Sequence, residues 1–414
     1  MKTQPKNKLS LWAVLILGGI PLVASATGFR LPDQDAFATA RGEAFAATAD
    51  NPSAIYYNPA GITQLQGQNF RAGIYAIDLE PTFESTSGPN AGNKYHNHDK
   101  YHAAAHLFYT YTKQDSIFSF GLGVYSPYGL GVKWGQDTGF RTLGTEGAVT
   151  TMAINPVIAV KLSPTLSIAA GVSAQCAMAD LRQGIIFPTA VDGLRFDGDG
   201  WGVAYNLGVM WQPHEKLSFG ISFRSQTTIN LSGHTEDFGL TQTPERTSAH
   251  ANLTLPLSAV FAVSYRPTPK WNFEFDADYT DWDVMKTMTI EQTQPTALGQ
   301  NLPFVFNWQS SWYYEFGATR YLENGWHVSA GYILNENSVP DAHYTTQVVD
   351  MERHFFSVGV GHKGKKFDFD VAYQLGYGPE RTVSGSAPSL GGQTADGKYS
   401  FLSHALSVTV GLRF

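Results

Sequence analysis

The chain alternates between apolar and polar residues in many short segments, and the last segment shows this most clearly. From Leu406 to Phe414 the even-numbered positions are apolar, and the odd-numbered positions carry small or polar residues. Successive side chains of a β-strand point to opposite faces. The segment therefore predicts a strand with one face suited to lipid and the other suited to a polar interior.

Fourteen alternating segments can be assigned from residue 69 onward. They cover approximately residues 69–79, 101–112, 116–126, 149–162, 166–182, 200–212, 217–232, 248–266, 271–290, 308–321, 326–336, 351–363, 367–380 and 400–414. Short and long spacers alternate between them. The short spacers are 113–115, 163–165, 213–216, 267–270, 323–325 and 364–366.

This regular alternation of spacers is typical of outer-membrane barrels, which have short periplasmic turns and long extracellular loops. A soluble β-sandwich would not impose it. A closed barrel also pairs every backbone N–H and C=O group, which the hydrocarbon of a membrane requires. We therefore predict an all-β protein of the bacterial outer membrane, a transmembrane antiparallel β-barrel of about fourteen strands occupying residues 69–414.

Residues 27–68 do not follow the strand pattern. They contain Ala-rich stretches compatible with helices, at 36–49 and 52–57. A fourteen-strand barrel has a wide interior that a selective channel must fill. We expect residues 27–68 to hang in the periplasm or, as we prefer, to fold back into the lumen as a small helical N-terminal hatch.

Residues 1–26 have the features of a cleavable signal peptide. Lys2, Lys6 and Lys8 precede an apolar run from Leu9 to Val23, and the small residues 24–26 follow it. A membrane-anchoring helix would need about 20 consecutive apolar residues, and this run is shorter. We predict cleavage after residue 26.

Composition excludes several functional classes. Removing residues 1–26 takes away three lysines and no acidic residue, so the formal charge changes from −7 to −10, which does not favour nucleic acid. Only 15% of residues are charged, below the average for soluble proteins. Cys176 is the single cysteine, so it forms no intramolecular disulfide and no cysteine-based metal site. We expect it to be a small packing residue.

Two groups of residues have side chains of the types that bind metal ions. One is a polar cluster that contains His96, His98, Asp99, His102 and His106, and the other is a Gly-rich segment that contains Asp192, Asp197 and Asp199. An exposed polar loop explains the first group equally well, and the second lacks the remaining ligands of a calcium loop. We predict no metal, no cofactor and no catalytic residues, because no Ser/His motif is specific enough to indicate an enzyme.

Charged residues in the predicted strands should face the lumen. Glu274, Asp276 and Asp278 share one strand face, opposite aromatic residues, and we expect them to pair with nearby cations rather than to perform acid–base chemistry. Candidate lumenal cations for an anionic headgroup are Arg182, Arg195, Arg224 and Arg320. The alternation does not show which of these converge.

Several short motifs are spread along nearly the whole mature chain. They are Thr27–Leu31, Asn58–Gly61, Pro127–Leu130, Arg266–Trp271 followed by Tyr279–Trp282, and Ser338–Asp341 followed by Asp350–His354. In sequence and in order these motifs resemble the FadL/TodX family of outer-membrane channels for long-chain fatty acids and other hydrophobic compounds.

The resemblance implies roles for particular residues. Phe29 and Leu31 would lie near the ligand, and Asn58, Pro59 and Ala60 would form the hatch motif. Pro127, Tyr128, Gly129 and Leu130 would form a kink in the third strand that opens the barrel wall sideways. Pro127 removes a ladder donor and Gly129 weakens a strand, which suits a kink. The alternative is an ordinary turn into the next loop.

The resemblance also implies a passive route. Outer loops capture an apolar ligand, a tighter lumenal site receives it, and it leaves through the wall. Long-chain fatty acids are the expected substrates. Aromatic or alkane hydrocarbons, or a non-transporting surface receptor or adhesin, are the alternatives. We expect a monomer that contacts outer-membrane lipid and lipopolysaccharide, with Phe414 as the signal for the barrel-assembly machinery.

Overall fold

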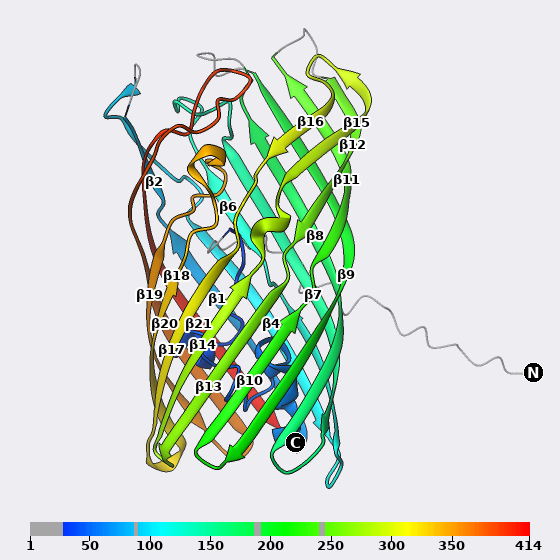
Figure 1. Ribbon diagram of the computed structural model, residues 1–414, viewed down its shortest axis with the longest axis vertical. Helices are drawn as coiled ribbons and strands as arrows, with labels where there is room; N and C mark the ends of the chain where they lie inside the picture. The colour runs from blue at the N-terminus through cyan, green and yellow to red at the C-terminus, as the bar shows by residue number, and fades with distance from the viewer. Residues whose placement is uncertain (1–27, 87–89, 186–191, 240–244) are drawn as a thin grey trace, which may run out of the picture.

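The computed structural model describes residues 28–86, 90–185, 192–239 and 245–414, and most of them belong to one antiparallel sheet with 21 strand segments (Figure 1). The segments are β1 (Gly67–Leu79), β2 (Thr82–Ser85), β3 (Lys94–His96), β4 (Tyr101–Thr112), β5 (Phe118–Tyr125), β6 (Gly129–Lys133), β7 (Glu146–Lys161), β8 (Leu166–Gln183), β9 (Gly193–His214), β10 (Leu217–Arg224), β11 (Thr227–Phe238), β12 (Glu245–Leu255), β13 (Ser258–Thr268), β14 (Trp271–Thr280), β15 (Thr287–Thr296), β16 (Gly299–Val305), β17 (Ser311–Tyr321), β18 (Trp326–Asn335), β19 (Arg353–Lys363), β20 (Phe367–Val383) and β21 (Gly397–Arg413).

These segments form a closed barrel of fourteen strands, as predicted. Neighbours in the chain pair antiparallel, and the ring closes where β1 pairs with β21, from Asn69 opposite Arg413 to Leu79 opposite Ser403. Closure leaves no open sheet edge where first and last strands meet. The proposed signal peptide lies outside the described residues.

The helices are few and short. They are α1 (Ala36–Ala40), α2 (Ala54–Tyr57), η3 (Pro59–Gln64), η5 (Trp282–Val284), η6 (Glu323–Gly325) and η7 (Asp341–His343). Within the described ranges, none of them is long and apolar enough to cross a membrane.

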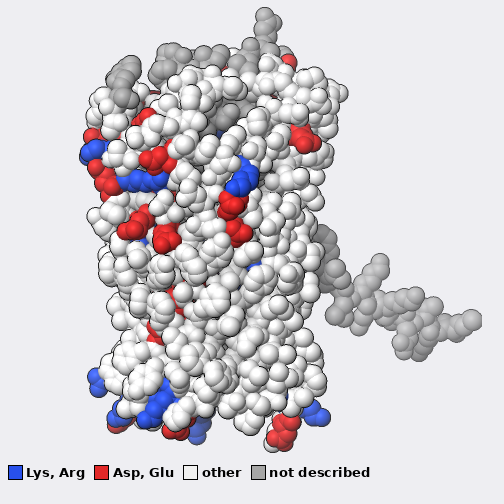
Figure 2. Space-filling view, in the orientation of Figure 1, with Lys and Arg blue, Asp and Glu red and all other residues white. Residues whose placement is uncertain are grey.

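The predicted alternation of faces holds in the closing strand. Leu406 is 51% exposed on the outside, whereas Thr409 is fully buried inside. Most charged side chains visible in Figure 2 gather at the rim with the short turns and in a belt toward the loop end. The surface between them is largely uncharged, as expected for a wall that faces lipid.

Three predicted strands are each interrupted. The segment 217–232 divides into β10 and β11, and 248–266 divides into β12 and β13 around Pro256. The segment 271–290 is broken by η5 between β14 and β15. Pro256 has no backbone N–H to give to a ladder, which accounts for the second break. In each case β-structure resumes toward the loop end, so the count of crossings is unchanged.

The N-terminal residues from 28 to 66 lie inside the barrel, in the half with the short turns (Figure 1). The helix expected over 36–49 is much shorter than predicted, because α1 ends at Ala40. Gly42, Glu43 and Ala49 adopt positive φ angles of 61°, 61° and 33°. Such angles cannot continue a right-handed helix, so the chain turns repeatedly between α1 and α2.

Candidate functional site

The ring of Phe29, near the start of the hatch, lies among three other aromatic rings. Its centroid is 5.9 Å from that of Tyr128, 5.0 Å from that of Trp282 and 6.0 Å from that of Trp308, all edge-on. Gly28 makes this approach possible, since a Cβ added there would lie 2.6 Å from the Trp282 ring. The edge-on arrangement is favourable for aromatic pairs. It fixes the N-terminal segment in the centre of the lumen.

An apolar cavity borders Phe29 on the side of the outer loops. Its empty volume is about 500 Å³. Gln347 is the only polar residue among those that line it. The lining consists of Phe29, Leu130, Val149, Ala179, Leu181, Leu231, Leu253, Met285, Met288, Phe306, Trp308, Gln347 and Val348. Such a space suits an apolar molecule that pushes flexible side chains apart.

The third barrel strand breaks beside this cavity. β5 ends at Tyr125 and β6 begins at Gly129, and both segments pair with β7. Three residues, Ser126 to Tyr128, form the break, at the place predicted for the kink. Gly129 does not have a positive φ, so its contribution is the absence of a side chain rather than an unusual backbone angle.

The barrel wall lacks a ladder next to the break. β4 pairs with β5 only from Leu107 to Thr112, while its part from Tyr101 to His106 pairs with β1 alone among the described strands. Among the described strands, β6 pairs only with β7. The two edges meet again near the outer end, where His98 N donates to Lys133 O at 2.8 Å.

The N-terminal segment binds the edge left free at the break. Leu31 N donates to Pro127 O at 2.9 Å, and Gly129 N donates to Phe29 O at 2.7 Å. Arg30 and Tyr128 form the antiparallel bridge between these bonds. The structure thus brings Phe29, Tyr128 and Leu130 together, whereas Leu31 is buried but does not line the cavity.

An ion pair holds the same segment to the opposite wall. Arg30 Nη2 lies 2.6 Å from Asp278 Oδ2, and Arg30 Nη1 donates to Thr280 Oγ1 at 2.8 Å. Both charged side chains are almost fully buried. The N-terminal segment therefore spans the lumen from β14 to the break in the third strand.

The carboxylates of β14 face inward, as predicted, and bind the hatch. Asp276 accepts hydrogen bonds from the backbone of residues 45 and 46, and Glu274 accepts them from residues 47 and 48. Arg41 Nη2 also lies 3.1 Å from Glu274 Oε2. Only Glu274 and Asp278 pair with a cation; Asp276 instead accepts two backbone N–H groups, both at Oδ2.

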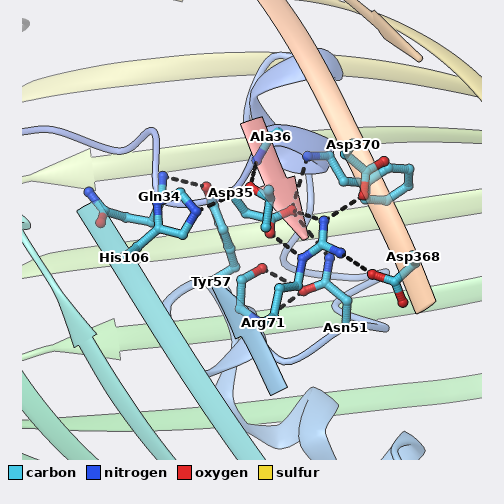
Figure 3. Close-up of polar contacts among 12 residues, drawn as sticks. Gln34, Asp35, Ala36, Asn51, Tyr57, Arg71, His106, Asp368 and Asp370 are labelled. Atoms are coloured by element: carbon cyan, nitrogen blue, oxygen red, sulfur yellow. Dashed lines mark hydrogen bonds and ion pairs between the residues drawn. The ribbon is translucent and has the colours of Figure 1, made fainter. Parts of the chain in front are cut away.

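A second network anchors the hatch to the closing strands (Figure 3). Arg71 of β1 binds Asp35, which caps α1, and also contacts Asp368 at 2.7 Å and Asp370 at 2.6 Å. His327 Nε2 lies 2.6 Å from Asp370. This network borders a polar cavity at the short-turn end, with an empty volume of about 1060 Å³.

Two other hatch residues are held by specific contacts. Asn58 accepts from Ala60 N and donates to Ala46 O and Val209 O, and Pro59 occupies the first turn of η3. Asp33 accepts from Gln374 Nε2 at 3.1 Å. Burial raises the pKa of Asp33 to about 6, although hydrogen bonds to its carboxylate oppose this rise.

Three of the four candidate lumenal cations were predicted wrongly. Arg182 and Arg195 both bind Asp180 and share the outer face of β8 and β9, and Arg320 stacks outside on Trp271. Only Arg224 faces the lumen, where it binds Tyr56 O and the hydroxyl of Tyr125. Period-2 alternation assigns a residue to the inner or the outer face only when the face of another residue in the same strand is already known.

Sequence reasoning missed Arg353, the first residue of β19. Its side chain is fully buried, and within the described residues its one hydrogen bond is from Nη2 to Val349 O. It forms no ion pair with any described residue. The sequence gives no signal for this, because the absence of a partner depends on residues distant in the chain.

The candidate metal ligands do not converge. His102 and His106 point inward from β4 and bind Asp99 O and Thr409 Oγ1 respectively. Asp192 is buried against Arg141, apart from Asp197 and Asp199 on β9. Among the described residues, no three His, Cys, Asp or Glu side chains are placed to hold a metal ion.

Comparison with known proteins gives one family. Residues 20–414 match the family model described as outer membrane protein transport protein (OMPP1/FadL/TodX). A long-chain fatty acid transport protein of Escherichia coli (strain K12) is 22% identical over 376 residues, which are 80% of this chain and 83% of the relative. A 47 kDa outer membrane protein of Pasteurella multocida is 25% identical over 383 residues, 86% and 87% of the two chains.

Solved structures show the same fold. A Pseudomonas aeruginosa FadL homologue superimposes with a TM-score of 0.83 at 18% identity, covering 94% of this chain and 100% of the other. The Pseudomonas putida toluene transporter TodX gives a TM-score of 0.72 at 14% identity, covering 94% and 100%. At these identities the likeness concerns the architecture alone.

Proposed function

Because the chain belongs to the outer membrane protein transport protein family (OMPP1/FadL/TodX), whose members carry hydrophobic compounds across the outer membrane of Gram-negative bacteria, we propose that long-chain fatty acids are its main substrates. The name of the Escherichia coli relative supports this choice. We place the protein among passive channels rather than enzymes, and we propose that it acts as a monomer.

The observation that carries the proposal is the apolar cavity at Phe29, which ends beside the break in the third strand. A water-filled pore would give an acyl chain no help, since each CH₂ exposed to water costs about 0.8 kcal/mol. In the proposed route, outer loops capture the ligand and pass it to this cavity. It then leaves sideways between β4 and β6, where the ladder is missing.

The N-terminal segment would control the last step. Its hydrogen bonds to Pro127 and Gly129 occupy the free edge at the break. An occupant of the cavity that displaced Phe29 would strain these bonds, because Phe29 O is the acceptor of one of them. The hatch, anchored on β14 and on Arg71, would meanwhile block the straight path to the periplasm.

A second substrate class has some support within the same mechanism. Phe29, Phe306 and Trp308 give the cavity three aromatic rings, which would also accept an aromatic hydrocarbon. A surface receptor or adhesin with a permanently closed hatch is the remaining alternative.

Uptake of labelled oleate tests the proposal. Cells lacking their own fatty-acid channel would be compared with and without this protein, after heat-modifiable gel mobility has confirmed folding. Faster uptake with the protein is expected. An unchanged rate with a folded barrel would contradict the fatty-acid assignment, and labelled toluene would then be tested before a receptor role is considered.

A further inference from the structure

An open apolar groove runs along the outer face of the wall, in the half of the barrel with the short turns. It lies over β13, β14, β17 and β18 and has an empty volume of about 1010 Å³. Ala318 and Ala330, which lie opposite each other on β17 and β18, form its floor, whereas their neighbours Thr319 and Ser329 are buried inside. Its sides are aromatic and include Tyr265, Phe273, Phe275, Phe316 and Tyr332. The groove is therefore a concave apolar surface that faces lipid.

The groove lies on the side of the ring opposite the break in the third strand. Along the strand pairs, as many of the fourteen strands separate β5 from β17 in one direction as in the other. A molecule in the groove would neither use nor block the proposed exit between β4 and β6. Its identity therefore does not depend on the proposed function.

Arg320 stands at the end of the groove nearest the short turns. It follows Ala318 by two residues on the outer face of β17, which places it roughly 7 Å closer to the rim. Its guanidinium lies over the ring of Trp271, 5.4 Å from the ring centre. No described residue forms an ion pair or a hydrogen bond with this side chain, and Glu323, the acid nearest in the chain, is beyond ion-pair distance.

Stacking on Trp271 leaves the donors of this guanidinium free, because it uses the face of the group while the five N–H bonds point outward from its edge. Arg182 and Arg195, which also face outward, differ because both bind Asp180. Trp271 and Trp326 begin the two strands that flank β17 at this rim. Such aromatic residues mark the level of the lipid headgroups. The free donors therefore lie at the level of the lipid phosphates.

We propose that the groove binds one phospholipid of the periplasmic leaflet, with its phosphate on Arg320 and an acyl chain over Ala318 and Ala330. Because short turns lie on the periplasmic side, the lipid at this rim is a phospholipid rather than lipopolysaccharide. A guanidinium binds phosphate through parallel N–H bonds from its edge, which the stacking leaves free. From Arg320 to Phe316 the wall extends roughly 13 Å, close to the half of an about 30 Å hydrocarbon core that one leaflet fills.

The wall behind the groove carries the hatch. Gly317 and Gly331 are neighbours of the two alanines and face inward, where the turn at residues 41 and 42 packs against them. A Cβ at Gly317 would lie 2.6 Å from Arg41 O, and one at Gly331 would overlap the backbone of Gly42. A lipid in the groove would thus pack on the outside of the wall on which the hatch rests. Its binding should raise the thermal unfolding midpoint.

The test counts lipids on the delipidated, full-length mature protein by native mass spectrometry. The two probes are palmitoyl-oleoyl phosphatidylglycerol and the diacylglycerol with the same chains, which lacks the phosphate. The wild type should retain one phosphatidylglycerol, with a higher unfolding midpoint, at concentrations at which it retains no diacylglycerol. Arg320→Gln should weaken phosphatidylglycerol binding about fivefold or more, and Arg320→Lys should keep part of it. Ala330→Phe, which fills the groove with a ring that faces lipid, should weaken it as much.

Lys161→Gln is the matched control, because it removes the same charge from the same rim at the end of β7, on another side of the ring. It should bind phosphatidylglycerol as the wild type does. Equal retention of the two probes, an equal loss in the control, or unchanged binding by folded Arg320→Gln and Ala330→Phe would overturn the proposal and leave ordinary lipid contact. A dimer in place of a bound lipid would assign the groove to a second copy of the chain and overturn it as well.

Discussion

At the scale of single residues, Phe29 connects the cavity with the strand break. Its ring lines the cavity and its backbone oxygen accepts from Gly129 N. Phe29→Ala should weaken oleate binding about tenfold, because burying a phenyl group against a ligand contributes roughly 1.5–3 kcal/mol at most. Titration of the purified protein measures this. Phe261→Ala, on the lipid face, is the control, and unchanged binding by Phe29→Ala would place the ligand elsewhere.

Asp33 should make the hatch sensitive to pH. Burial raises its pKa to about 6 from 3.8, so the folded hatch favours the protonated acid. The stability from Asp33 is therefore complete below pH 3.8 and is lost as the pH rises through 6, a change of up to about 3 kcal/mol. Hydrogen exchange of residues 28–66 should show stronger protection at pH 5 than at pH 7.5.

Asp33→Asn mimics the protonated acid and separates its effect from those of other carboxylates. In this variant the difference in protection between the two pH values should shrink. An unchanged difference would assign the pH dependence to another group, such as the neighbouring Glu43.

Residue roles were the part least accessible from sequence. The alternation correctly predicted that Glu274 and Asp278 face the lumen, because regular strand geometry determines which face a side chain occupies. It could not show that Asp276 accepts N–H groups of the hatch, or that no described acid forms an ion pair with Arg353. Those facts depend on the folded N-terminal segment and on loops, which pack through contacts far apart in the chain.

At the scale of elements, the break in the third strand is the feature to test. Pro127 has no N–H for a ladder, so Pro127→Val would allow the strand to continue toward β4. We expect oleate uptake to slow several-fold in cells that display the folded variant. Pro156→Val in the neighbouring β7 is the control and should leave uptake unchanged. Equal rates for wild type and Pro127→Val would remove the break from the exit route.

Strands were more predictable than the hatch. Period-2 alternation and short turns gave fourteen crossings, because each strand must satisfy the same two environments. The hatch follows no such rule. The predicted helix was too long, because Glu43 and Ala49 adopt positive φ angles that end a right-handed helix. Glu and Ala side chains give no sign of such angles in the sequence.

At the scale of the whole molecule, the barrel interior is divided along its axis. The hatch lies in the half of the barrel with the short turns, and the outer loops lie at the other end (Figure 1). The apolar cavity borders Phe29 at the start of the hatch, and Glu274 and Arg71 anchor the rest of the hatch through ion pairs. The polar cavity at Arg71 opens toward the end with short turns. This order fits the proposed lateral route, in which an apolar molecule would leave through the wall before it reached the charged half of the lumen.

If the hatch blocks the straight path, its removal should convert the barrel into a leaky pore. Deleting residues 27–66 removes the contacts that fill the lumen beside Arg71 and Glu274, and a barrel of this size without them has space for water. Bilayer conductance and uptake of a small polar antibiotic should both rise. Arg71→Met loosens one anchor only and should give an intermediate conductance with frequent closures. A deletion variant that folds but conducts no better than wild type would place the barrier in the outer loops, because two seals in series are opened only when both are removed.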